Sequence, residues 1–227
     1  MIFRDLRLLE VQETFYRPVS VTRATRWRRK APEGFAFTVK ASQFITHEAS
    51  SPTYRRAGLD AAAVAGDRYG AFRDTPEVWA GWQATEAVSM ALEAPAIVFE
   101  TPASFGPTSE NTKNLYGFFE RARGRATFVW EPRGGWPSYV VEKVCSDLGL
   151  VHGVDPFADE STTIGIAYFR LHGAPPGEKM HRSSYTGDDL NRLRDIAVEY
   201  DDAYVLFDNV TSFDDARRFQ RRLEASD

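Results

Sequence analysis

The 227-residue sequence is poor in cysteine, has no long hydrophobic run at its start and carries little net charge. Its single cysteine, Cys145, excludes an intramolecular disulfide, which fits a reducing compartment. The opening MIFRDLRLLE is charged, so we expect neither a signal peptide nor a membrane span, and a cytoplasmic protein. The net charge of −4 argues against binding nucleic acid over the whole surface, although it allows a local basic groove.

Repeats, low-complexity tracts and domain linkers are also lacking, so we expect one domain over residues 1–227. Short apolar runs alternate instead with helical patterns. The runs are nearly continuous in apolar or aromatic residues, as strands covered on both faces are. This alternation predicts βαβ units and a parallel sheet, with strands at 7–11, 35–40, 96–100, 126–131, 150–154, 166–172 and 203–208.

Helix signals fill the segments between the predicted strands. Thr186 with Asp189 three residues later is a capping-box pattern, and Thr211 with Asp214 repeats the start signal. Apolar residues then recur on one face of each segment. The pattern predicts further helices at 21–29, at 79–92, after Ser109, and from near Pro137.

One connection, at about 41–77, is unusually long and has little strand character. A short helix near 59–65 is expected within it. Long connections in compact domains are uncommon and are often lids or binding loops. The segment is rich in aromatic residues and possible ligands, including His47, so we interpret it as a lid rather than as an unstructured insertion.

Most predicted strands end in polar residues. Side chains two apart on a strand share a face, so Arg170 and His172 should point together while Phe169 and Leu171 point toward helices. In an α/β barrel, the loops after the strands build the site at the carboxyl-terminal mouth. The alternative is a set of ion pairs without function. The polar residues at these ends are Glu10, Lys40, Glu100, Glu131, Arg133, Asp155, Arg170, His172, Asp208 and Asn209.

These strand ends resemble those of the DUF-72 family (domain of unknown function 72), whose members are TIM-type barrels. The resemblance spans nearly the whole chain in the family's order, and it is strongest to the archaeal-type branch, which carries TSPTYRR-like and EPRG-like segments. It implies a polar pocket at the mouth, but the family name assigns no activity. The matching motifs are LEVQETFY (9–16), GFAFTVKASQFITHE (34–48), VFETPASF (98–105), VWEPRGGW (129–136), VDPF (154–157), YFRLHG (168–173) and VLFDN (205–209).

The sequence departs from the family pattern in four places. The family's first strand has no counterpart before residue 7, so either the assigned start is late or the barrel has seven strands. A seven-stranded barrel would have a seam between 7–11 and 203–208, and such an open edge would allow a homo-oligomer. The family usually has Gln at Glu100 and Asn at Asp208, so both residues add negative charge to the mouth. The tyrosine-rich stretch after RLHG is reduced here to GEKMHRSSY.

The polar ring suits a small anionic ligand. Arginine forks match phosphate and carboxylate oxygens, so Arg133 and Arg170 are the predicted clamp. Glu131 or Asp155 is the predicted base and His172 the acid. The other predicted ligand-binding residues are Glu10, Tyr16, Lys40, His47, Glu100, Trp136, Asp208 and Asn209.

Three functions stay open at this point. The first is an enzyme acting on a phosphate- or carboxylate-bearing molecule. The second is a nucleic-acid-processing barrel like metal-dependent endonucleases, which four histidines make less favoured; no metal site is predicted. The third is a non-catalytic binding or scaffold barrel. The sequence indicates no particular cofactor.

Overall fold

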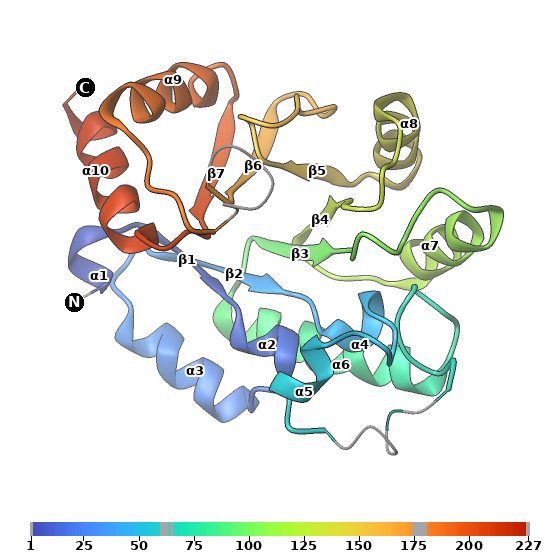
Figure 1. Ribbon diagram of the computed structural model, residues 1–227. Helices are drawn as coiled ribbons and strands as arrows, with labels where there is room; N and C mark the ends of the chain where they lie inside the picture. Colours follow the sequence, from blue (N-terminus) through green and yellow to red (C-terminus); the bar gives the residue numbers. More distant parts are fainter. Residues whose placement is uncertain (1, 60–63, 65, 174–180, 226–227) are drawn as a thin grey trace.

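Seven parallel strands form a single sheet that curls into a TIM-type α/β barrel, with helices on its outside (Figure 1). This computed structural model describes residues 2–59, 64, 66–173 and 181–225. The sheet order follows the chain order from the first strand to the seventh. The strands are β1 (Leu8–Val11), β2 (Ala36–Lys40), β3 (Ala96–Glu100), β4 (Thr127–Glu131), β5 (Val151–Val154), β6 (Ile166–Leu171) and β7 (Asp202–Phe207).

All seven predicted strands are confirmed within one or two residues at each end. The helices also lie where the sequence places them, and helix α9 begins with the predicted capping box of Thr186 and Asp189. The longer helices are α3 (Val21–Lys30), α6 (Pro76–Leu92), α7 (Ser109–Arg121), α8 (Ser138–Leu148), α9 (Gly187–Ala197) and α10 (Ser212–Glu224). The short ones are α1 (Ile2–Asp5), α2 (Glu13–Tyr16), α4 (Gln43–Thr46) and α5 (Thr53–Arg56).

Three helix starts differ in detail from the sequence interpretation. Helix α6 begins three residues before the predicted Trp79, because Thr75 caps it through the Val78 N–H and Pro76 occupies its first turn. Thr108, and not Ser109, caps α7. Thr211 precedes α10 but makes no capping bond, because its hydroxyl donates to the Asp215 carboxylate instead. The helix expected near 59–65 lies mostly outside the described residues.

Alternation along β6 divides its side chains between two environments, as predicted. Phe169 and Leu171 face outward and pack with Leu190 and Leu193 of α9. Tyr168 faces the barrel interior, where it belongs to a small apolar cluster with Val98 and Val129 among others. Arg170 and His172 continue that inward face to the carboxyl-terminal mouth, so this strand carries its charges to the site.

The barrel stays unsealed between β1 and β7, as the missing first strand predicts. The two strands are neighbours but form no ladder in the part of the chain that the structure describes. A cleft of about 600 Å³ opens here, with Leu8, Phe207 and Phe219 among its lining residues. Helix α10 covers the gap and is tied to the chain start by the Arg217–Asp5 ion pair at 3.4 Å. Association through this edge remains a prediction.

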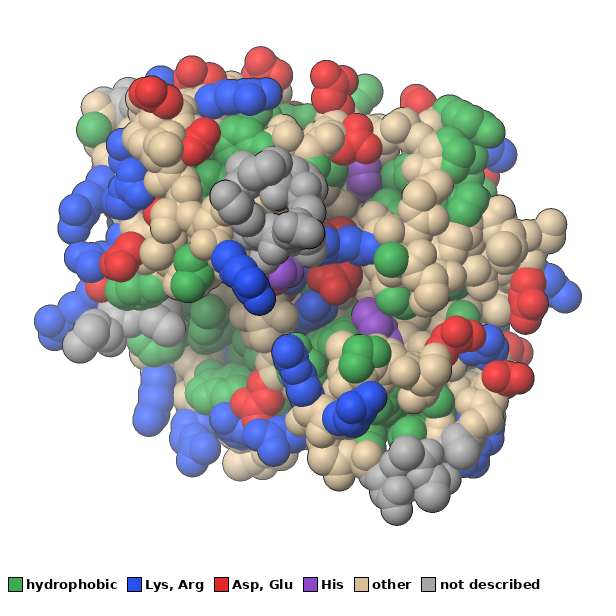
Figure 2. All heavy atoms as spheres, viewed as in Figure 1, with side chains coloured by type: hydrophobic (Ala, Val, Ile, Leu, Met, Phe, Trp, Pro, Cys, Tyr) green, Lys and Arg blue, Asp and Glu red, His purple; other side chains and the backbone are tan. Residues whose placement is uncertain are grey.

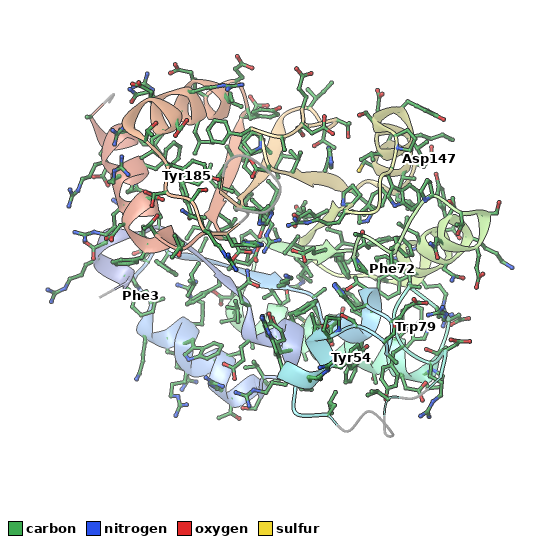
Figure 3. All side chains as sticks on the ribbon, in the orientation of Figure 1. Phe3, Tyr54, Phe72, Trp79, Asp147 and Tyr185 are labelled. Atoms are coloured by element: carbon green, nitrogen blue, oxygen red, sulfur yellow. The ribbon has the colours of Figure 1, made fainter. Side chains whose placement is uncertain are left out.

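The long 41–77 connection is anchored at both described ends. Gly70 donates its N–H to the Phe44 carbonyl oxygen at 2.8 Å, and Phe72 N–H donates to that of Ile45 at 2.9 Å. A Cβ at Gly70, whose φ is +75°, would lie 2.2 Å from the His47 carbonyl carbon, so only glycine fits this contact. The Phe72 ring is buried and lies beside helix α7 (Figure 3). Closure of this segment as a lid remains a prediction.

Cys145 is buried in α8, and burial raises the pKa of its thiol to about 12. A thiol with a raised pKa stays protonated and is a poor nucleophile, because the thiolate is the reactive form. In the described part of the chain, helices of the length and apolarity needed to cross a membrane are absent.

Candidate functional site

Arg170 is the centre of the charged cluster at the mouth. Its side chain is 0% exposed. Its guanidinium binds Glu10 of β1 at 2.9 Å, Glu100 of β3 at 2.5 Å and Glu131 of β4 at 2.5 Å. Asp208, after β7, lies 3.5 Å away. One arginine therefore joins the ends of five strands, and the convergence that the sequence predicts is confirmed.

Glu100 and Glu131 are direct neighbours in the β3–β4 ladder, which places two carboxylates at one level. Arg170 lies between them, and Lys40 of β2 binds Glu100 at 3.1 Å from the other side. The Lys40 ammonium also lies 4.4 Å from the centre of the buried Phe15 ring. Since like charges side by side repel, these two strands need both cations to be stable.

His172 and Arg133 continue the cluster toward solvent. His172 Nε2 lies 3.0 Å from Glu131 Oε1 and 2.5 Å from an Arg133 guanidinium nitrogen. Arg133 in turn binds Glu131 at 2.7 Å. Glu131 and Arg133 thus lie on the same side of the chain at the end of β4. On the other side of the ring, His172 Nδ1 lies 3.6 Å from Asp208 Oδ2.

The cluster keeps its carboxylates ionised despite burial. Burial raises the pKa of Glu131, but Arg170 and Arg133 outweigh it and hold that pKa well below the ordinary value. Burial also raises the pKa of Glu100, and here Lys40 and Arg170 outweigh both burial and the Glu131 charge, so the pKa is lowered. Both groups therefore remain charged at neutral pH.

Charges in the cluster do not favour an anion by themselves. Four carboxylates, from Glu10, Glu100, Glu131 and Asp208, face three permanent cations, from Lys40, Arg133 and Arg170. The region around the mouth is different: Figure 2 shows basic side chains standing around the hollow where acidic, basic and histidine side chains meet.

An open cleft of about 250 Å³ lies beside the cluster. Glu131, Arg133 and His172 form one wall, and Trp136 and His152 are among the other lining residues. Arg133 is the most accessible cation of the cluster, with 23% of its side chain exposed, against 8% for Lys40. Concave sites with an aromatic wall and a few convergent polar groups are typical of small-molecule binding.

Several predicted site residues instead hold the framework. Asp155 accepts the backbone N–H groups of His172 and Phe157, both at 3.0 Å. The Asn209 side-chain amide donates to the Ser183 carbonyl oxygen and to Asp215, each at 2.8 Å, which fixes the loop before α10. Ligand contacts by these residues remain predictions.

The aromatic members of the predicted ligand-binding set are mostly packed against the protein. Trp136 is buried, stacks on Phe105 and donates its indole N–H to the Phe105 carbonyl oxygen, so only its edge faces the cleft. Tyr16 is half-buried and accepts a long bond from exposed Arg56. His47 is buried, and burial lowers its pKa to about 4, so it is neutral at physiological pH.

Sequence reasoning missed two residues at the site. Tyr168, on the same face of β6 as Arg170, donates its hydroxyl hydrogen toward Glu10 at 2.7 Å. Strand alternation predicts that the Tyr168 side chain points into the barrel. Because Tyr168 lies two residues before Arg170 and deeper in the barrel, the sequence does not suggest that its hydroxyl contacts the charged cluster. His181 is the second: its ring packs edge-to-face on His172, with 5.2 Å between centroids. His181 lies in a loop, and in a loop the spacing of residues does not predict where a side chain points.

The fold and the charged mouth define a TIM-type α/β barrel with a polar cluster at the carboxyl ends of its strands. The model of the family described as "Protein of unknown function DUF72" matches residues 3–227, and the chain belongs to that family. The resemblance in the motifs is therefore confirmed. No curated protein matches the chain.

Solved structures show the same fold at low identity. A DUF72 family protein from Enterococcus faecalis V583 is 17% identical, with a TM-score of 0.71, covering 98% of this chain and 91% of that one. A DUF72 family protein from Thermotoga maritima MSB8 is 20% identical, with a TM-score of 0.67 and coverage of 96% and 85%. A xylose isomerase domain containing protein from Salmonella typhimurium LT2 is 13% identical, with a TM-score of 0.51 and coverage of 98% and 97%.

Proposed function

We propose that this barrel binds a small molecule carrying a phosphate or carboxylate group, in the cleft beside Arg133. The observation that carries the proposal is the position of Arg133. Its guanidinium is the most accessible cation of the cluster and lies on the wall of an open cleft. Arginine presents a planar fork that matches phosphate and carboxylate oxygens.

The remaining cleft residues suit a small ligand. The edge of Trp136 supplies an apolar surface, while Glu131 holds Arg133 at 2.7 Å and so fixes the direction of its fork. Basic side chains around the mouth also favour the approach of an anion (Figure 2). The acid–base roles predicted for Glu131, Asp155 and His172 would make the site hydrolytic, and they remain predictions.

A non-catalytic scaffold barrel predicts that the charges pair off and leave no open pocket. The buried cations do form ion pairs, since Arg170 and Lys40 both bind Glu100. The cleft beside Arg133 nevertheless stays open. This combination favours a ligand site over a scaffold. Processing of nucleic acid is the less favoured alternative, since the cleft holds about 250 Å³, the size of a small molecule.

A thermal-shift panel of phosphate- and carboxylate-bearing metabolites, run with EDTA, tests the proposal. A ligand at about 100 times its Kd stabilises the folded state by about 2.7 kcal/mol, which gives a clear rise in Tm. Arg133→Gln keeps the size of the side chain and removes its charge, so it should lose most of that rise. Arg26→Gln, an exposed arginine on α3, is the matched control and should keep it.

His172→Ala is a second test of the proposal, because His172 lines the same cleft as Arg133. It should also reduce the ligand-induced rise in Tm. Equal rises in the wild type, Arg133→Gln and His172→Ala for every active compound would place the ligand elsewhere and end the proposal.

A further inference from the structure

One ring nitrogen of His172, Nδ1, is buried and makes no hydrogen bond of ordinary length to a described residue. The residue is 4% exposed, and Nδ1 is buried without a hydrogen-bond partner in the described part of the chain. Its nearest carboxylate oxygen, Asp208 Oδ2, is 3.6 Å away, beyond ordinary hydrogen-bond length. A buried polar atom without a partner is costly, so Nδ1 indicates a missing ligand.

The groups around Nδ1 are metal ligands. One ligand atom from each of His172, His181 and Asp208 lies within 4.8 Å of the others. We propose that these three residues bind a divalent transition-metal ion at the mouth of the barrel. Two imidazoles and one carboxylate suit zinc or ferrous iron and leave coordination positions open, whereas magnesium and calcium prefer oxygen ligands alone.

The surrounding hydrogen bonds orient both rings for this task. His172 Nε2 contacts Glu131 Oε1 at 3.0 Å and an Arg133 guanidinium nitrogen at 2.5 Å, so this nitrogen is occupied by the cluster and Nδ1 is the one that lies toward Asp208. His181 Nδ1 lies 2.5 Å from the Asp208 carbonyl oxygen, where it donates its hydrogen and leaves the lone pair on Nε2. Histidines that ligate metals nearly always donate their other N–H to a carboxylate or a carbonyl.

The backbones of the three residues are tied together as well. His181 N–H donates to the His172 carbonyl oxygen, and Asp208 N–H donates to the Leu171 carbonyl oxygen. Zinc ligands at about 2.0–2.2 Å from the ion lie about 3.3 Å apart, so ligand atoms that are within 4.8 Å of one another have to close by up to about 1.5 Å. The His181 side chain is 46% exposed and the Asp208 side chain 43%, which gives them room for that movement.

The charge of the cluster also favours a cation. A divalent ion would offset the excess of carboxylates over permanent cations, and it would add positive charge close to Arg133. The metal site does not depend on the anionic ligand proposed above, because its test uses the metal alone.

Calorimetric titration of EDTA-treated, desalted protein with ZnCl₂ tests the site. We expect one equivalent to bind. His181→Ala and Asp208→Asn change partly exposed side chains, so both variants should fold, and each should weaken zinc binding at least about tenfold. Asp159→Asn removes an exposed carboxylate of the neighbouring cleft and should leave zinc affinity unchanged. Magnesium chloride should give no comparable binding.

Cobalt provides an independent readout through its visible absorption. One equivalent of Co²⁺ should give d–d bands that His181→Ala reduces or shifts. The proposal is overturned if the wild type binds no stoichiometric zinc, or if His181→Ala and Asp208→Asn bind it as tightly as the wild type. Binding of magnesium as tight as that of zinc would equally contradict a histidine site.

Discussion

Replacing Arg170 by methionine should lower the free energy of unfolding by about 3–5 kcal/mol at neutral pH, because it leaves buried carboxylates without their partner. Glu10, Glu100 and Glu131 all contact this guanidinium, and Glu100 and Glu131 face each other across the ladder. Methionine fills similar volume, so the expected loss is mainly electrostatic. Urea unfolding of the two proteins in EDTA measures it.

A double variant separates charge from packing. Adding Glu100→Gln to Arg170→Met removes one of the stranded carboxylates, so it should restore part of the lost stability. Arg26→Gln, on the surface of α3, should change stability by less than about 0.5 kcal/mol. An equal loss with and without Glu100→Gln would show that packing, and not charge, sets the cost.

The cost of Arg170→Met should also depend on pH. In the wild type the pKa values of Glu100 and Glu131 are lowered, so their stabilising effect is present above the unfolded value of about 4.5 and is lost as pH falls through the folded values. The variant lacks the charge that keeps these pKa values low. The stability difference between the two proteins should therefore be full at pH 7 and shrink below about pH 4.5. A difference that grows toward acid would contradict this account.

The barrel and its mouth could be predicted because both follow from short-range patterns. Strands covered on both faces are nearly continuous in apolar residues, and their polar ends can be read directly, as at Lys40 and Arg170. Parallel strands then bring these ends to one rim whatever their distance in the sequence. The alternation of Phe169 and Leu171 with Arg170 and His172 followed from the two-residue period of a strand.

The pairing inside the mouth could not be predicted in the same way. That Asp155 accepts backbone N–H groups, and that Asn209 holds the loop before α10, depends on loop conformations that no periodicity specifies. His181 reaches His172 from such a loop. The sequence also shows which charges converge, but not that Arg170 would be shared among three carboxylates. That sharing makes Arg170 and its three carboxylates a structural unit, so the proposed ligand site lies at the more exposed Arg133.

Phe72→Ala is expected to lower the free energy of unfolding by about 3–5 kcal/mol, the usual cost of removing a buried phenylalanine ring. The Phe72 ring is 1% exposed and contacts Phe99 of β3 and the rings of Phe105, Phe118 and Phe119. Ala71 and Phe72 both adopt positive φ, at 50° and 53°, which is unfavourable for residues with a Cβ. The free energy gained by burying the Phe72 ring must therefore exceed the conformational free energy that this turn costs.

The result decides how far the 41–77 segment can act as a lid. If Phe72 anchors the segment to the core, Phe72→Ala should lower global stability in urea unfolding and speed hydrogen exchange throughout β3 and α7 as well as in the loop. Phe213→Ala, a half-buried ring at the β1–β7 seam, should cost clearly less. Faster exchange confined to the loop, with global stability unchanged, would show instead that the whole segment opens independently. In the anchored case, closure over the mouth can involve only residues before Gly70, since the Gly70–Phe72 turn would move only when the barrel itself unfolds.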